Sequence, residues 1–553
     1  MVVGRGGCGY ARVALDEANA GENVFIDWLL HAYSGTLEIH DVTPQDQASQ
    51  LLAPRLLVAV NEDVQGPRLI KREELVPHHL WVVPPALWEQ VRAGQAALPD
   101  GFERVPARSW RRTPRHEDSS TSVRQVLLTN FRCFEQTRFS FGAGMNVLIG
   151  QNGAGKTTVL DALAMGLASV VRPLFHTLDA VFPELPLRVQ DIRVARIDKG
   201  GTTTFEPQYP SSIDVHMDAF GQQIEAGPFT YRHESGAVFT GPGRAISFLD
   251  PSDVVRWAVQ DGFDVTLPLI AYYGTGRTWQ GGQERASTGD DLSRLAGYEG
   301  CLEPSIQLSS MRAWFRRMEL LALQDGHTPP VLEASKRAML ACLDGFDLVR
   351  YDARLDDLAA RSVETGLLLG FEQLSDGQRN MLGMVADMAY RAATLNPHLG
   401  PDAALKTPGV VLIDELDLHL HPAWQRRVVG DLRRAFPRVQ FIATTHSPQV
   451  LSSVRRDEVV HLHRGASVAS KEFVEGRDSN SLLEDVFGVP ARPADMQERL
   501  RGVFTAIDDE RYEDAARDLA AAEAMLGPSD PDVIRARWML DREAADRAAL
   551  PQG

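Results

Sequence analysis

Residues 150–157 read GQNGAGKT, which matches the phosphate-loop pattern GxxxxGK[ST] at every fixed position. The apolar run 145–149 comes directly before the loop, and apolar side chains recur at helical spacing after Lys156. The sequence therefore predicts a strand, a phosphate loop and a helix in that order. Because such a loop sits at the end of a buried strand, this feature restricts the chain to an α/β fold.

The loop residues predict a bound ATP with Mg²⁺. Glycine lets the backbone wrap tightly, so that successive N–H groups and the helix N-terminus point at phosphate oxygens. We expect Lys156 to reach the β- and γ-phosphates, the Thr157 hydroxyl to bind Mg²⁺, and Thr158 to contact the α-phosphate. The expected nucleotide contacts from this loop are Gly150, Asn152, Gly153, Gly155, Lys156, Thr157 and Thr158.

A second apolar run ends in two carboxylates. Residues 409–415 read GVVLIDE, and 410–413 are apolar without alternation, as in a strand that is buried on both faces. We expect Asp414 to complete the Mg²⁺ shell and Glu415 to orient and deprotonate the attacking water. Two acids after a strand are common in loops, so it is their combination with the phosphate loop that predicts hydrolysis.

Two further segments predict contacts with the triphosphate. His446 follows the strand-like run 439–444, and this order places it beside the nucleotide, within reach of the γ-phosphate. The signature segment, LSDGQRN at 374–380, opens a helix in which Ser375 is a natural N-cap and Gly377 adds to a second anion site. Since the phosphate loop already holds one side of the triphosphate, we expect this second site to face another nucleotide.

The set NGAGKTT, LSDGQRN, VVLIDELDLHLHP and TTHSPQ resembles the ATPase heads of the ABC/SMC/RecF-like class. The resemblance implies a homodimer or higher homo-oligomer, in which Ser375, Gly377 and Gln378 of one copy close on the ATP of another. The family signature usually reads LSGGQ, and here Asp376 replaces the middle glycine.

Other family elements are carried over to single residues. Arg132, in TNFRCF, resembles an arginine that lies near the nucleotide. Asp417, in DELDLH, resembles a residue that makes a contact across the dimer. Gln190, in RVQDIR, resembles the residue that couples nucleotide and metal to the lid, and Asp191 is the alternative for that role.

The phrases DELDLHLHPAWQ, LPLIAYYGTGR and EGRDSNSLLEDVFGVPARP look like a bacterial group of antiphage-defence ATPases that includes the Septu subunit PtuA. This resemblance implies a sensor or regulator that controls a separate HNH-type nuclease. We expect no nuclease activity in this chain, because the tail after His446 lacks an acid-rich strand pattern. A RecF-like DNA repair ATPase and a scaffold whose assembly is controlled by nucleotide remain as alternatives.

The composition limits the partners. The formal net charge of -17 means that contact with nucleic acid requires a local patch of Lys and Arg. The four cysteines are far apart and form no CxxC pair, so neither a zinc site nor a disulfide framework is predicted. No apolar run approaches the roughly 20 residues of a membrane helix. We expect a cytoplasmic protein that does not enter the membrane.

The predicted fold is an α/β, ABC-type P-loop head with a mixed sheet flanked by helices, a helical C-terminal extension and a small N-terminal α+β segment. Short strands are expected at 56–60 and 80–83, and a helix at 24–33. Residues 104–122 are rich in Arg, Pro and Ser, which is typical of a linker, or of a basic arm that touches nucleic acid. The expected parts are an N-terminal segment at 1–103, this linker, an ATPase domain at 123–478 with a lid insert at 170–361, and a helical extension at 479–553 in which GPSDP joins antiparallel helices.

Overall fold

The structure is a computed structural model that describes residues 37–42, 56–61, 68–71, 79–83, 90, 120–175, 185–199, 202–220, 222–232, 238–241, 255, 259, 264–277, 293–306, 308–463, 466–469 and 474–549. The expected helix at 24–33 and most of the expected linker, 104–119, lie outside these residues. The chain divides into two compact units. Unit 1 runs to His446 and includes Asp457–Ala469, and unit 2 comprises Ser447–Arg456 and the residues from Ser470 onward.

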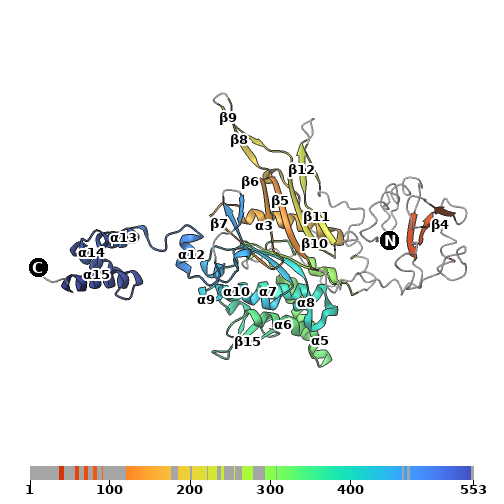
Figure 1. Ribbon diagram of the computed structural model, residues 1–553. Helices are drawn as coiled ribbons and strands as arrows, with labels where there is room; N and C mark the ends of the chain where they lie inside the picture. The colour runs from red at the N-terminus through yellow and green to blue at the C-terminus, as the bar shows by residue number, and fades with distance from the viewer. Residues whose placement is uncertain are drawn as a thin grey trace, which may run out of the picture. The chain divides into compact units, whose positions relative to one another are not determined.

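A six-stranded sheet forms the centre of unit 1 (Figure 1). Its order is β14 (Leu269–Tyr273), β18 (Gly409–Ile413), β19 (Val439–Thr444), β7 (Met145–Gly150), β20 (Val459–His463) and β21 (Ala466–Ala469). The strands from β14 to β20 are parallel, and β21 pairs antiparallel at the edge. Every residue of β7, β18 and β19 is buried, and the three strands confirm those predicted at 145–149, 410–413 and 439–444.

An antiparallel sheet forms a second layer. It contains β13 (Val238–Gly241), β12 (Phe229–Arg232), β10 (Ser211–Ala219), β5 (Ser122–Phe131) and β6 (Phe134–Ser140), with β11 (Gln222–Ala226) paired to β10. Helix α3 (Lys156–Val171) contacts β10 and β11 on one side and β7, β18 and β19 on the other, so it lies between the two sheets. Gln440 of β19 also joins the layers, because its amide exchanges hydrogen bonds of 2.7 and 2.8 Å with the backbone of Val123.

A helical layer packs beside the parallel sheet. It contains α5 (Leu308–Asp325), α6 (Pro330–Cys342), α7 (Asp376–Leu395), α8 (Ala403–Lys406), α9 (Pro422–Gln425) and α10 (Val428–Ala435), with a small sheet of β15 (Phe346–Asp352), β16 (Asp357–Ser362) and β17 (Leu368–Gly370). Helix α7, which starts in the signature segment, is buried along most of its length and contacts α5, α6 and β14. The phosphate loop and the start of α7 therefore both belong to unit 1.

Residues 170–361, which we expected as an insert, contribute strands to both main sheets. Within them, β10 pairs with β5 and β14 pairs with β18. The same stretch forms the hairpin of β8 (Val194–Lys199) and β9 (Thr202–Pro207), a separate ribbon in Figure 1. A four-stranded sheet near the N-terminus has the order β1 (Leu37–Val42), β2 (Leu56–Asn61), β4 (His79–Val83) and β3 (Arg68–Lys71). It confirms the strands predicted at 56–60 and 80–83.

Unit 2 is helical where it is described. Its elements are α11 (Pro448–Leu451), α12 (Ser479–Asp485), α13 (Ala494–Asp508), α14 (Tyr512–Leu526) and α15 (Pro531–Ala549). The stretch before GPSDP, which looked continuous, is broken into α13 and α14 by a turn in which Glu510 has a left-handed φ of 61°. Burial of Val503, Leu519 and Val533 joins α13, α14 and α15 in one small core.

The arrangement of sheets and helices confirms the predicted α/β class with a helical C-terminal region. None of the helices in the described ranges is both long and apolar enough to cross a membrane.

Candidate functional site

The phosphate loop follows β7 and is shaped by glycines that other residues cannot replace. Gly150 and Gly155 have φ of 154° and 99°. A Cβ atom on Gly150 would lie 2.5 Å from the Leu462 carbonyl oxygen. A Cβ atom on Gly155 would lie 2.6 Å from the Phe134 ring and 2.8 Å from Cys133 Sγ. The loop thus packs against the β5–β6 turn on one side. Its glycines allow the tightly curved backbone that is needed to surround a phosphate group.

Lys156 and Thr157 are the first residues of α3, as the motif predicts. The Lys156 ammonium donates to the Gly150 and Gln151 carbonyl oxygens of its own loop, at 2.9 and 3.1 Å. Burial lowers the pKa of Lys156, and the carboxylates of Asp414 and Glu415 oppose that shift. Thr158 forms a hydrogen bond with Cys133. The loop therefore brings a cation close to the two acids that the sequence placed at the end of β18.

Asp414 links the phosphate loop to the neighbouring strands. Its Oδ2 accepts a hydrogen bond of 2.9 Å from the Thr157 hydroxyl, and its Oδ1 accepts one of 2.6 Å from the Thr444 hydroxyl. The pair of Thr157 and Asp414 suits Mg²⁺, which is usually held by one or two carboxylates together with substrate phosphates. Within the described residues no group of three His, Cys, Asp or Glu side chains could hold a metal ion.

Glu415 has a left-handed backbone, with φ of 50°. Its N–H donates to Thr444 Oγ1 at 2.7 Å, and the N–H of Leu416 donates to the Thr444 carbonyl oxygen at 2.8 Å. A non-glycine residue in this region costs roughly 1–3 kcal/mol and persists only where its surroundings hold it. Glu415 is only partly buried.

Sequence reasoning missed Arg277, which ends the GTGR turn after β14. Its guanidinium is 3% exposed and donates to the backbone oxygens of Asp414 and Glu415, at 2.5 and 2.8 Å. The available signal was an arginine in a glycine-rich turn after the apolar run LIAYY. That turn lies at the carboxyl edge of a parallel sheet, where sites in α/β folds usually form.

His446 and Asp417 lie beyond the same sheet edge. Asp417 Oδ1 accepts hydrogen bonds from the Thr445 hydroxyl at 2.5 Å and from the His446 N–H at 3.3 Å. Partial burial, followed by the charge of Lys156, lowers the pKa of His446 against the opposing effect of the nearby carboxylates. The imidazole is therefore neutral at physiological pH and lies close enough to Lys156 to be influenced by its charge.

The signature segment is an ordered helix N-terminus. The Ser375 hydroxyl accepts from the Gln378 N–H at 3.4 Å, and the Gln378 side chain accepts from the Ser375 N–H at 3.0 Å, which forms a capping box. The Asp376 carboxylate pairs with Arg379 along the helix. Gly377 is buried, and a Cβ atom there would lie 2.6 Å from the His419 carbonyl oxygen. The glycine thus lets α7 approach the loop that follows β18.

The β5–β6 turn, which packs against the phosphate loop, contains Arg132. Asp191 and its sequence neighbour Gln190 lie close to this arginine. Arg132 donates to Asp161 of α3 and to Asp191, at 2.5 and 2.9 Å. Asp191 is 2% exposed and also accepts from the Arg188 N–H at 3.1 Å, so its carboxylate is already occupied. Gln190 is exposed. This difference favours Gln190 over Asp191 for a role toward nucleotide.

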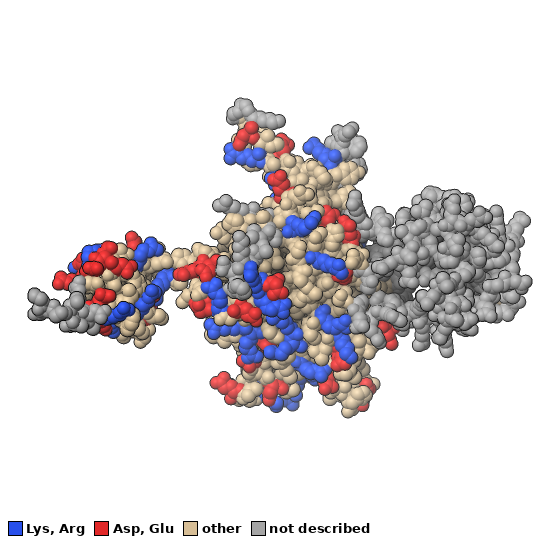
Figure 2. Space-filling view, viewed as in Figure 1, with Lys and Arg blue, Asp and Glu red and all other residues tan. Residues whose placement is uncertain are grey.

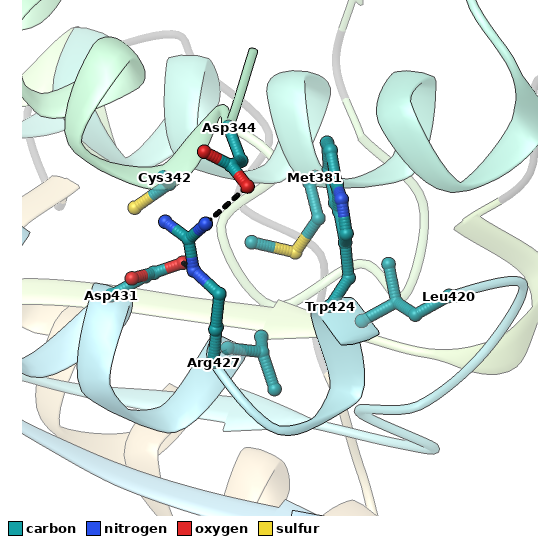
Figure 3. A pocket seen from close by; sticks show the side chains of 8 residues that line it. Cys342, Asp344, Met381, Leu420, Trp424, Arg427 and Asp431 are labelled. Carbon is teal, nitrogen blue, oxygen red and sulfur yellow. Dashed lines mark ion pairs between the residues drawn. The ribbon is translucent and has the colours of Figure 1, made fainter. Parts of the chain in front are cut away.

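A small crevice lies beside α7, the helix that starts in the signature segment (Figure 3). Met381 of α7 faces Leu420 and Trp424 across it, and the ion pair of Arg427 with Asp344 borders it. Residues of α6, α7, α9 and α10 and of the loop that follows β18 line the crevice. It contains none of the residues predicted to bind nucleotide.

Lys and Arg side chains gather on one face of unit 1, interspersed with Asp and Glu (Figure 2). Several of the arginines near α10 are paired: Arg427 with Asp344, Arg433 with Glu458, and Arg434 with Asp431. The pairing offsets much of the local positive charge, so these arginines by themselves do not make a strong phosphate-binding patch.

Two family models match the chain. One, described as "AAA domain, putative AbiEii toxin, Type IV TA system", matches residues 325–452, which include the signature segment, Asp414, Glu415 and His446. The other, described as "AAA domain", matches residues 125–204, which include the phosphate loop. The matched ranges therefore coincide with the residues that the structure gathers at the edge of the parallel sheet.

Known proteins are similar over most of the chain. The protein named "Retron Ec83 probable ATPase" from Escherichia coli is 25% identical over 504 residues, which cover 77% of this chain and 88% of that protein. The "Septu protein PtuA" from Bacillus thuringiensis is 27% identical over 429 residues, which cover 74% of this chain and 95% of that protein. A solved SMC head domain from Thermotoga maritima is 14% identical, covers 63% of this chain and 99% of its own, and has a TM-score of 0.35.

The phosphate loop thus has the geometry of a P-loop protein, and residues 125–204 and 325–452 match AAA-domain models. The chain is similar to a retron ATPase and to Septu PtuA along most of its length.

Proposed function

We propose that the chain binds ATP with Mg²⁺ and hydrolyses it, with residues 123–478 as the ATPase domain. The observation that carries this proposal is the hydrogen-bonded set in which Thr157 and Thr444 hold the two oxygens of Asp414 next to Glu415. Lys156 binds the β- and γ-phosphates, and Glu415 accepts the proton of the attacking water. Thr157 and Asp414 hold Mg²⁺, which neutralises charge that develops on the phosphates. His446 contacts the γ-phosphate as a neutral ring.

The proposed active form is a homodimer. Ser375 is exposed at the N-terminus of α7, where the helix dipole and free N–H groups favour an anion. Ser375, Gly377 and Gln378 of a second copy complete the shell around each ATP, with Asp417 at the contact between copies. Binding of ATP closes the two heads and hydrolysis releases them. In this proposal, Arg132 and Gln190 contact the nucleotide from the side on which the β5–β6 turn packs against the phosphate loop.

The proposed role is that of a sensor and regulator in bacterial antiphage defence. The similarity to Septu PtuA and to a retron ATPase over about three quarters of the chain supports this role. A separate HNH-type nuclease in the cytoplasm is the proposed effector, released or activated when the ATP-bound heads change state. The proposal includes nucleic acid as a further partner.

Two variants test the proposed hydrolysis. Glu415→Gln keeps the shape of the side chain and removes the base, so it should bind ATP with normal affinity and lose nearly all turnover. Lys156→Ala removes the cation that binds phosphate and should lose affinity for ATP in calorimetry. Turnover close to that of the wild type in Glu415→Gln, or unchanged affinity in Lys156→Ala, would rule out these roles.

The proposed partner is tested with the same Glu415→Gln variant. The tagged variant is held in its ATP-bound state in cell extract, and the captured proteins are identified by mass spectrometry. Lys156→Ala is the matched control, because it should not close. Recovery of a small HNH-type nuclease with Glu415→Gln alone supports the defence role. Recovery of recombination proteins, or of DNA without a nuclease, favours the DNA repair alternative.

A further inference from the structure

Arg277 lies directly beneath the two catalytic acids. Its Nη1 donates to the Asp414 carbonyl oxygen at 2.5 Å and to the Gly274 carbonyl oxygen at 3.0 Å. Its Nη2 donates to the Glu415 carbonyl oxygen at 2.8 Å. One rigid guanidinium fork therefore holds the peptide groups on both sides of the left-handed Glu415 backbone.

The same guanidinium reaches the signature helix. Its Nε donates to Asn380 Oδ1 at 2.8 Å, and Asn380 Nδ2 donates to the Leu418 carbonyl oxygen at 2.9 Å. Asn380 is 3% exposed and follows Gly377 by less than one helical turn. The side-chain amide of Asn380 thus bridges two groups: its oxygen accepts from Arg277, and its nitrogen donates to the loop after β18.

Burial makes this connection costly to break. An unpaired buried donor costs about 1–3 kcal/mol, and more when the group is charged. Burial lowers the pKa of Arg277 to about 10, and the carboxylates of Asp414, Glu415 and Asp417 counteract the shift. The side chain is therefore a cation at neutral pH.

We propose that Arg277 is a positioning residue that, through Asn380, couples the signature helix to Glu415. The proposal rests on the proposed ATP hydrolysis at this site. When the start of α7 engages the nucleotide of another copy, the displacement of Asn380 moves Arg277, and Arg277 moves the carbonyl groups of Asp414 and Glu415. Arg277 does not contact nucleotide in this scheme, and it sets the orientation of the base.

A second contact between α7 and the same loop provides the matched control. Met381 is the neighbour of Asn380 and faces Leu420 and Trp424 across the crevice of Figure 3. Met381→Ala removes packing from that contact and leaves the hydrogen bonds of Arg277 in place. If coupling ran through this apolar contact, Met381→Ala would uncouple the helix from Glu415, and Asn380→Ala would not.

The test compares Arg277→Lys, Asn380→Ala, the double variant and Met381→Ala in the full chain. Lysine keeps the charge and cannot make four directed hydrogen bonds. We expect affinity for the analogue AMPPNP to stay within about threefold of wild type and kcat to fall by about 10- to 100-fold in Arg277→Lys and Asn380→Ala. The double variant should be no slower than the slower single variant, because both changes break one link. A double variant whose loss equals the product of the single losses overturns the coupling.

Hydrogen exchange measured by mass spectrometry gives a readout that does not depend on turnover. In the wild type, AMPPNP should protect residues 375–385 and residues 414–420 together. In Arg277→Lys and Asn380→Ala it should protect the first segment only, and Met381→Ala should behave like the wild type. Joint protection that persists in Arg277→Lys overturns the proposal.

The two proposals fail in different ways. A wild-type protein that binds AMPPNP and hydrolyses no ATP defeats the proposed function, and the exchange comparison still decides whether Arg277 couples the two segments. If Arg277→Lys does not fold, as judged by its thermal unfolding, Asn380→Ala carries the test, since it leaves the three carbonyl contacts of Arg277 intact.

Discussion

The Thr444 hydroxyl donates a hydrogen bond of 2.6 Å to Oδ1 of Asp414 and accepts one of 2.7 Å from the N–H of Glu415. Thr157 holds the other oxygen of Asp414, so the carboxylate is fixed from two sides. Thr444 is fully buried, which means that water has no direct access to replace its hydroxyl. One side chain of β19 therefore holds both the carboxylate of Asp414 and the backbone of Glu415 at the end of β18.

Thr444→Val tests this relationship, because valine has the same shape and lacks the hydroxyl. The change leaves an Asp414 oxygen and the Glu415 N–H without their partner. We expect the free energy of unfolding to fall by about 1–3 kcal/mol and kcat to fall more than KM changes. Urea unfolding and steady-state ATP hydrolysis measure the two effects. Thr444→Ser keeps the hydroxyl and should retain most of the activity, whereas a fully active Thr444→Val would contradict this role.

Gly155→Ala and Gly153→Ala form a matched pair in the phosphate loop. Both positions have a left-handed φ, 99° and 78°, so alanine is strained at each. At Gly155 the added methyl also collides with Phe134 and Cys133, whereas at Gly153 nothing lies within 4 Å. We expect Gly155→Ala to reduce ATP affinity more than tenfold, and Gly153→Ala to cause a clearly smaller loss. Calorimetry with AMPPNP separates the two, and equal losses would mean that the β5–β6 turn does not shape the loop.

A buried ion pair should control the stability of α7. Arg391 donates to Asp387 at 2.8 Å, with both side chains 2% exposed or less, and the Tyr273 hydroxyl donates to the same carboxylate at 2.7 Å. Arg391→Met leaves the Asp387 charge buried without its cation, so we expect a loss of about 3–5 kcal/mol in the free energy of unfolding. The double variant Asp387→Leu, Arg391→Met should be more stable than Arg391→Met alone. Denaturant unfolding measures these free energies. A double variant whose loss in the free energy of unfolding equals the sum of the two single losses would contradict this account.

Much of the site was predictable from the sequence because its signals are local. The phosphate loop and β18 are contiguous patterns with a steric or burial cause, and the structure places Lys156, Thr157, Asp414 and Glu415 together. Arg277 was not predictable in the same way, because its partners Asn380 and Asp414 lie 103 and 137 residues away. The place of β14 in the parallel sheet was hard to predict for the same reason, because its partner strand β18 lies far along the chain. The turn between α13 and α14 was missed because no glycine or proline marks it, and Glu510 takes the left-handed conformation instead.

The pH dependence of hydrolysis should reflect His446. The pKa of its ring is lowered from the ordinary 6.5, first by partial burial and then by Lys156. As pH falls below 6.5, the unfolded chain binds the proton before the folded protein does, so this residue's contribution to stability is lost progressively in that range. For the same reason, the neutral ring of the folded protein persists below pH 6.5.

We therefore expect any fall in kcat/KM caused by His446 to begin below pH 6.5, since kcat/KM reports the titration of the free protein. Measurement of kcat/KM between about pH 5 and 8 in wild type and His446→Asn isolates the effect, because asparagine keeps a hydrogen-bonding group and does not titrate. The acid limb should be present in the wild type and absent or weaker in the variant. A limb centred at or above pH 6.5 that disappears in His446→Asn would show that the nearby carboxylates, rather than burial and Lys156, dominate the environment of this ring.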